Sequence, residues 1–404
     1  MHPFDSFELA RAQIALDRER TAHMPTLFEH KVERMCTSSV GCLRGAAPLY
    51  YATLAAHHDL ADGPAGEGWI VGDLHVENFG VYRPSPLDPR VHTPSTEVAL
   101  DINDFDDTVI GPWRLDVMRL VTSLVLAVRG RGASGERTVT LANAMLDAYV
   151  ESAFGEHGPG TPPKPVASLL QTLKSRSRTE LLDARTKKSH GGRRFLRDGK
   201  RYVDLPHATD VAAREAFAEY ARKMKKAHGI DADHFEVLDT AFRVAGTGSL
   251  GTLRIAVLVS GKGGEDGSWV FDMKAQGKPS AAALLKVPEQ VPAERVIAGM
   301  HALLEHPLHM VSAVRMGSES MFVRRLTPQE DKLDISRVHE HDLESTVRYL
   351  GSLTGAAHRR AVVGTPPRAW SQADCAALLN RALALAGMHE SIYLAYAWLT
   401  HAGK

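Results

Sequence analysis

The sequence predicts a two-lobed α+β fold, with an antiparallel sheet lobe and a helical lobe. Three observations predict it. Residues 236–330 alternate polar and apolar side chains as strands do, and they contain a glycine-rich turn. Helical patterns occupy both ends of the chain, and an Asp- and Asn-rich loop lies before residue 110. The expected parts are a helical part with this loop (1–130), a helical insert (131–235), the sheet lobe (236–330) and helices that complete the helical lobe (331–404).

The composition is that of a globular protein, with 44% hydrophobic and 24% charged residues among 404. A formal net charge of zero gives no global electrostatic basis for binding nucleic acid or an anionic membrane. No signal peptide is recognisable, and no apolar run approaches the roughly 20 residues that span a bilayer. The three cysteines are too scattered for a disulfide framework or a zinc site. We therefore expect a cytoplasmic protein.

Residues 69–80 have the pattern of a catalytic loop. After an apolar lead-in typical of a short buried strand, Gly72 lets the chain turn, and Asp73 and Asn78 follow in the spacing D-x-x-x-x-N. In kinase-type sites the Asp of this spacing accepts the proton of the attacking hydroxyl, and the Asn reaches a magnesium ion. The spacing alone is weak, because Asp and Asn are also ordinary turn residues.

The segment that follows supplies a second carboxylate for the metal. Residues 98–102 alternate as a strand should, and they deliver Asp104 beside the catalytic loop. Magnesium prefers oxygen ligands, so we expect Asn78 and Asp104 to hold it. His75, Asp106 and Arg44 are candidate contacts to substrate or phosphate. For Arg44, at the start of an apolar helix, a structural ion pair is the alternative.

The glycine-rich turn lies between two strand-like segments at 242–259. It has the pattern G-x-G-x-x-G, but β-branched and apolar residues follow it, so it joins strand to strand and does not open a helix. This favours a flap over nucleotide phosphates. Lys274 ends the next strand and would contact the α- and β-phosphates. Glu294 from the following helix would hold the lysine, and Glu289 in the loop before that helix is the alternative. The residues expected to bind the nucleotide are Gly246, Thr247, Gly248, Ser249, Gly251, Lys274 and Glu294.

The only marked basic run lies between residues 174 and 201, where eleven Lys and Arg residues occur. One interpretation is a mobile loop or lid that receives an anionic substrate or nucleotide phosphates. The alternative is a solvated loop, which is the commoner use of a charge run.

The segments Gly72-Asp-Leu-His-Val-Glu-Asn78 and Ile102-Asn-Asp-Phe-Asp-Asp107 resemble motifs of aminoglycoside-phosphotransferase-like kinases, although Val71 stands where those kinases usually have His. Together with Cys42-Leu-Arg-Gly-Ala-Ala47, they also resemble the bacterial family catalogued as domain of unknown function 2252. The kinase resemblance implies a kinase-like fold. Because the catalytic loop here precedes the glycine turn and lysine, that fold would be circularly permuted.

The expected function is transfer of the γ-phosphoryl group of ATP, with Mg²⁺, to a hydroxyl of a small molecule. In this scheme Asp73 is the base, Asn78 and Asp104 bind the metal, and Lys274 contacts phosphate. Two alternatives stay open. One is a pseudokinase that binds nucleotide for regulation, and the other is a nucleotidyl transferase that binds ATP in the reverse direction and transfers AMP.

Overall fold

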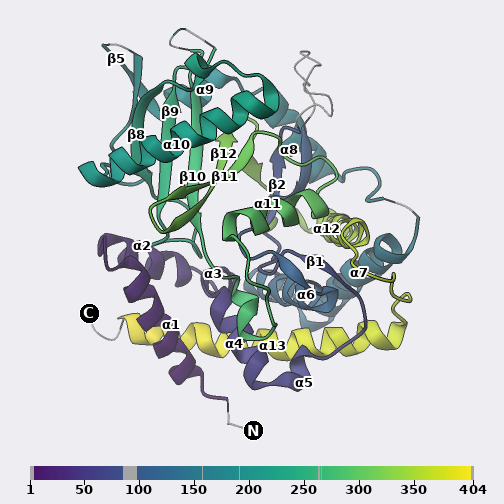
Figure 1. Cartoon of the computed structure of the whole chain (residues 1–404). Coiled ribbons are helices and arrows are strands. Elements are labelled where there is room, and N and C mark those ends of the chain that lie inside the picture. Colours follow the sequence, from purple (N-terminus) through teal and green to yellow (C-terminus); the bar gives the residue numbers. More distant parts are fainter. Residues whose placement is uncertain are drawn as a thin grey trace.

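The computed structural model describes residues 4–84, 98–156, 158–190, 192–262, 264 and 266–401. In these residues the fold is α+β, as predicted, and every strand pairing is antiparallel (Figure 1). No helix in this part of the chain combines the length and apolar character needed to cross a bilayer.

The largest sheet has six strands in the order β11-β12-β10-β9-β8-β7. On β9 and β10 the side chains alternate: Lys274 lies on one face with Arg254 and Asp272, and apolar residues such as Val257 lie on the other. We call the first the Lys274 face. The strands are β7 (Tyr202–Val203), β8 (Val237–Arg243), β9 (Arg254–Val259), β10 (Trp269–Gln276), β11 (Val311–Met316) and β12 (Glu319–Leu326).

Helix α10 (His207–His228) covers the face opposite Lys274 (Figure 1). Its Phe217 and Tyr220 pack on Phe271 of β10, with ring centroids 5.1 and 5.3 Å from that of Phe271. Helix α11 (Pro292–Leu303) lies between β10 and β11 in the chain. Three short 3-10 helices, η1 (Ala232–Phe235), η2 (Ser280–Ala283) and η3 (Ile335–Arg337), connect the larger elements.

The main hydrophobic core lies in the helical part, which is built from both ends of the chain. Helix α13 packs along α1 and α6, and the Phe7 and Trp398 rings are 5.6 Å apart. The helices are α1 (Ser6–Thr21), α2 (Thr26–Met35), α3 (Ser39–Gly45), α4 (Ala47–Ala56), α5 (His58–Ala61), α6 (Trp113–Gly130), α7 (Gly135–Phe154), α12 (Glu340–Arg360) and α13 (Gln372–His401).

Two small sheets carry the predicted catalytic segments. β1 (Glu67–Ile70) pairs with β4 (Val109–Pro112). β2 (Phe79–Tyr82) lies between β3 (Ala99–Ile102) and β13 (Asp331–Lys332). The loops at the ends of these strands therefore come close to the chain that leaves the six-stranded sheet.

Residues 131–235, expected as one helical insert, are shared between two cores. Helix α7 packs against α12 in the main core, whereas α10 packs on the six-stranded sheet. Between them lie α8 (Lys164–Lys174), α9 (Arg178–Asp183), β5 (Thr186–Ser189) and β6 (Gly192–Phe195).

The described residues of the basic run at 174–201 include the end of α8, α9 and the β5–β6 hairpin, and none of them lines the central cavity described below. The lid interpretation stays a prediction. Acidic neighbours pair with arginines of the run: Arg193 contacts Asp183 and Asp266, and Arg197 contacts Asp239. These ion pairs help to hold residues 186–195 as a hairpin, where the sequence alone indicated a loop.

Candidate functional site

A cavity of about 910 Å³ lies between the six-stranded sheet and the helical part. Its volume is in the range of small-molecule sites. Every residue that the sequence predicts for the site lines it, except Glu294. The lining residues of this set are Arg44, Asp73, His75, Asn78, Asp104, Asp106, Gly246, Thr247, Gly248, Ser249, Gly251 and Lys274.

The loop of residues 71–78, which we call the aspartate loop, begins with a turn that needs glycine. Gly72 has φ +81°, and a Cβ there would lie 2.1 Å from the carbonyl oxygen of Asp107. Asp116 of α6 accepts hydrogen bonds from the amides of Val71 (2.6 Å) and Gly72 (2.9 Å). From the first turn of α6, Asp116 therefore caps the turn before Asp73.

The rest of the aspartate loop is also held by hydrogen bonds. The amide of Val76 donates to Ser123 Oγ at 3.0 Å, and Asn78 Nδ2 donates to the carbonyl of Asp73 at 2.8 Å. His75 is buried, and its Nδ1 accepts from the amide of Glu77 at 3.2 Å. Burial places the pKa of His75 well below its ordinary value, so its ring is neutral at pH 7.

Asp73 faces the cavity beside a buried arginine that the sequence analysis missed. Arg119 of α6 forms an ion pair with the Asp73 carboxylate, donates to the carbonyl of Leu43 at 3.0 Å and lies over the Tyr50 ring. Burial raises the pKa of Asp73 to about 7, against the opposing effect of Arg119. A charged residue within the otherwise apolar helix after Asp116 was the available signal.

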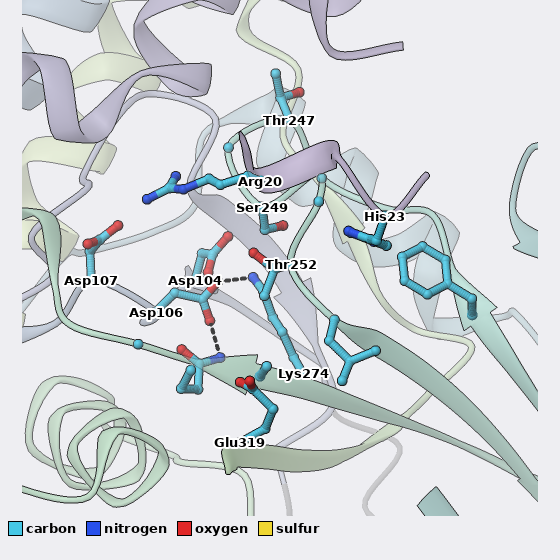
Figure 2. A pocket seen from close by; sticks show the side chains of 18 of the residues that line it. Arg20, His23, Asp104, Asp106, Asp107, Thr247, Ser249, Thr252, Lys274 and Glu319 are labelled. Atoms are coloured by element: carbon cyan, nitrogen blue, oxygen red, sulfur yellow. Dashed lines mark hydrogen bonds and ion pairs between the residues drawn. The ribbon is translucent and has the colours of Figure 1, made fainter. Parts of the chain in front are cut away.

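The acidic turn after β3 brings three carboxylates to the cavity, those of Asp104, Asp106 and Asp107 (Figure 2). Burial alone would raise the pKa of Asp104, but Lys274 and Lys332 hold it below its ordinary value, so Asp104 is ionised at neutral pH. In the described residues no group of three or more His, Cys, Asp or Glu side chains is arranged to hold a metal. Magnesium needs fewer, because it is often held by one or two carboxylates plus phosphates and water.

Lys274 points into the cavity and forms an ion pair with Asp106 (Figure 2). Asp106 also accepts from Gln276 Nε2 at 2.8 Å. Asp104, which was expected to face Lys274, lies close enough for its charge to affect the pKa of the lysine. The predicted strand and its inward lysine are thus present, with a different immediate partner.

The structure does not bring Glu294 to Lys274. Glu294 is exposed in the first turn of α11 and lies outside the cavity lining. The next residue, Arg295, turns inward and donates to the carbonyls of Thr108, Asp106 and Gly277. This buried arginine fixes the rotation of the first turn of α11, so Asp106 takes the place expected for Glu294.

Residues 244–253, the glycine loop, connect the antiparallel neighbours β8 and β9, as predicted. No helix follows Gly251. The loop touches the N-terminal helices: Arg34 donates to the carbonyl of Gly246, and Lys31 Nζ lies 3.4 Å from the carbonyl of Gly248. A Cβ at Gly251 would lie 2.6 Å from the carbonyl of Arg20, and its φ is +94°.

Two cationic side chains complete this view of the cavity. Arg44 lines the cavity and forms an ion pair with Glu77, which is the structural ion pair given above as the alternative to a phosphate contact. Lys332, which the sequence analysis missed, is exposed to the cavity, and its Nζ has no hydrogen bond or ion pair within the described part of the chain. Only its position on β13 beside β2 brings it to the site.

The arrangement offers a carboxylate poised to take a proton, an ionised carboxylate for a metal, cations for phosphate and a glycine loop around one space. No curated protein and no solved structure matches the chain. Residues 20–395 match the family described as "Uncharacterized protein conserved in bacteria (DUF2252)", and because this match covers most of the chain, the protein belongs to that family.

Proposed function

We propose that the protein is an ATP- and Mg²⁺-dependent phosphotransferase that acts on a hydroxyl group of a small molecule. The observation that carries the proposal is the single cavity shared by Asp73, Asp104, Lys274 and the glycine loop. These residues come from segments far apart in the sequence, and chance would not favour their meeting. Each supplies a group that phosphoryl transfer requires.

The order of parts in the six-stranded sheet supports this proposal. A glycine loop between two strands, a lysine on the third strand, a helix and then two further strands form the nucleotide-binding lobe of kinase-type enzymes. β8, β9, β10, α11, β11 and β12 follow this order. A circular permutation would account for the catalytic loop preceding these parts, because packing depends on position in space.

The chemistry assigned to the residues is as follows. The acceptor hydroxyl oxygen attacks the γ-phosphorus, the bond to the β-phosphate oxygen breaks, ADP leaves, and the hydroxyl proton passes to Asp73. A base is most effective when its pKa is near the working pH, and burial brings Asp73 there. Arg119 orients this carboxylate, and Lys274 and Lys332 contact phosphate. Asn78 and Asp104 would hold a magnesium ion, which when bound would neutralise charge on the phosphates.

The test is calorimetric titration of ATP with and without Mg²⁺. We expect Mg²⁺-dependent ATP binding by the wild-type protein, and its loss in Asp104→Ala. Glu319→Ala removes another carboxylate that lines the same cavity and serves as the matched control, with binding unchanged. Absence of ATP binding by the wild-type protein, or Mg²⁺-dependent binding by Asp104→Ala, would overturn the proposal.

Transfer of AMP is the second candidate. The cavity lining that would hold a triphosphate in one direction, Lys274 and the glycine loop, could also hold it in the reverse direction. Release of pyrophosphate would identify AMP transfer, whereas release of ADP identifies phosphoryl transfer. A pseudokinase would bind ATP and release neither.

A further inference from the structure

We propose that the base of the nucleotide binds in an outer pocket beside the start of α10, and not between the sheet and residues 327–331. This inference rests on the proposed binding of a nucleoside triphosphate. The outer pocket is the end of the cavity formed by Met24, Leu205, Pro206, Ala208, Phe242 and Leu253.

The place where a kinase-type cleft would hold the base is closed by this chain's own residues. Residues 327–331 follow β12 and lead into β13, where a kinase-type fold has the hinge whose backbone binds the base, but none of them lines the cavity. Gln329 is buried and donates to the carbonyl of Arg176 at 2.8 Å. Arg176 in turn pairs with Asp331 at 2.8 Å. The segment before α9 thus covers the hinge.

The apolar part of the Lys274 face is also covered. A base could stack on the side chains that β9, β10 and β12 present there. Instead, side chains of α9, β6 and β7 pack on them in one hydrophobic cluster. The covering residues are Leu182, Phe195 and Tyr202, and the covered ones include Ala256, Leu258, Val270 and Leu326.

Between this cluster and Lys274 the face is charged. Asp272 forms ion pairs with Arg243 at 2.6 Å and Arg254 at 2.5 Å. Arg254 stands opposite Lys274 in the strand register, and Arg324 stands opposite Asp272. Burying an apolar base against these charged groups would cost free energy. This part of the face therefore does not suit the base.

The outer pocket has the properties that a base needs. It is lined mainly by apolar side chains, and the His23 and Phe242 rings lie 5.9 Å apart at its wall. His23 and Thr209 supply polar groups for the edge of a base. In Figure 2 the acidic residues Asp104, Asp106 and Asp107 lie to one side of Lys274, and His23 lies to the other.

We assign the acceptor to another part of the cavity. Residues of α3 and α4, including Arg44, Ala47 and Pro48, line the cavity together with Asp73. An acceptor hydroxyl placed there meets the proposed base directly. In this assignment the nucleoside binds in the outer pocket, the acceptor binds beside Asp73, and the triphosphate binds at the glycine loop and Lys274.

The test fills the outer pocket without disturbing a core. Ala208 is exposed on the first turn of α10 and lines the pocket, so Ala208→Trp should obstruct it. Ala218 is exposed on the same helix outside the cavity lining, and Ala218→Trp is the matched control. Calorimetry compares Mg²⁺-ATP with inorganic tripolyphosphate, which has no base, and thermal melting verifies that both variants fold.

We expect Ala208→Trp to weaken ATP binding at least about tenfold, the loss of one well-placed contact surface, and to leave tripolyphosphate binding unchanged. Ala218→Trp should change neither. ATP binding of wild-type strength by folded Ala208→Trp would overturn the inference alone. A wild-type protein that binds no ATP would instead overturn the proposed function. If Ala208→Trp fails to fold, Ala208→Leu provides a smaller obstruction with the same expected direction.

Discussion

The aspartate loop and the glycine loop face the same cavity but are held in different ways. The aspartate loop is fixed by buried partners, among them Asp116, Ser123 and Arg119. At Gly246 and Gly248 the glycine loop accepts hydrogen bonds from Arg34 and Lys31 of α2. The loop assigned to proton transfer is therefore preorganised, whereas the loop assigned to phosphate has few bonds to break before it can move.

The largest expected effect concerns the chemistry of the aspartate loop. Asp73→Asn keeps the shape of the side chain and an oxygen that Arg119 can contact, but it removes the base. We expect ATP turnover to fall by about 10²–10⁴-fold, the usual contribution of a general base, with ATP affinity unchanged. Release of ADP or pyrophosphate measures turnover, and calorimetry measures affinity.

Glu319→Gln, a carboxylate change elsewhere in the same cavity, should retain turnover and serves as the control. Turnover of wild-type rate by Asp73→Asn would show that Asp73 is not the base. The contrast between the two loops would then lose its chemical meaning, although the difference in how they are held would stand.

The second prediction tests how firmly the aspartate loop is held. Asp116→Ala leaves the buried amides of Val71 and Gly72 without their acceptor, which should cost about 2–5 kcal/mol of unfolding free energy. Urea denaturation measures this. Asp374, which accepts from the amide of Ser371 at the start of α13 and is partly exposed, provides the matched control. Equal stabilities of Asp116→Ala and Asp374→Ala would contradict the assigned role of Asp116.

Much of the site could be predicted because its signals are local. Alternation from Trp269 to Lys274 marks a strand whose lysine points to one face, and β-branched residues after Gly251 exclude a helix. The D-x-x-x-x-N spacing likewise fixes where Asp73 and Asn78 emerge from one loop. Such patterns depend only on neighbours in the chain.

The partners of these residues could not be predicted in the same way. Whether Lys274 meets Glu294 or Asp106 depends on how α11 is rotated, and buried Arg295 decides that through contacts with three distant carbonyls. The basic run likewise finds Asp239 and Asp266, which come from later segments. The pattern of residues within one segment does not predict these contacts between distant segments.

The third prediction concerns a buried carboxylate on the strand before the acidic turn. Burial raises the pKa of Asp101 to about 6, against the opposing effect of Arg360. Its pKa in the unfolded chain is about 3.9. The folded state therefore binds the proton more tightly, and this group lowers stability as the pH rises from about 4 to 6.

Asp101→Asn should remove this loss and make the protein more stable than wild type at pH 7, by about 1–3 kcal/mol, with the difference shrinking toward pH 4. Urea denaturation at several pH values measures it. A difference that grows as the pH falls would have the opposite sign and would show that Asp101 is stabilised as a carboxylate in the fold.

The smallest expected effect concerns the glycine loop. Arg34 donates to the carbonyl of Gly246 from the surface of α2, so Arg34→Ala removes one anchor of the loop without opening a core. Global stability should change by less than about 0.5 kcal/mol, as for most surface substitutions. Local opening should become easier, so amide hydrogen exchange at 246–251 should accelerate by about 2–5-fold, while exchange at 71–78 stays unchanged.

Arg11→Ala on α1, where Arg11 lies over the Phe7 ring, is the matched control. Equal acceleration in both loops would mean that they open together, and the proposed division between a fixed base and a movable phosphate loop would fail.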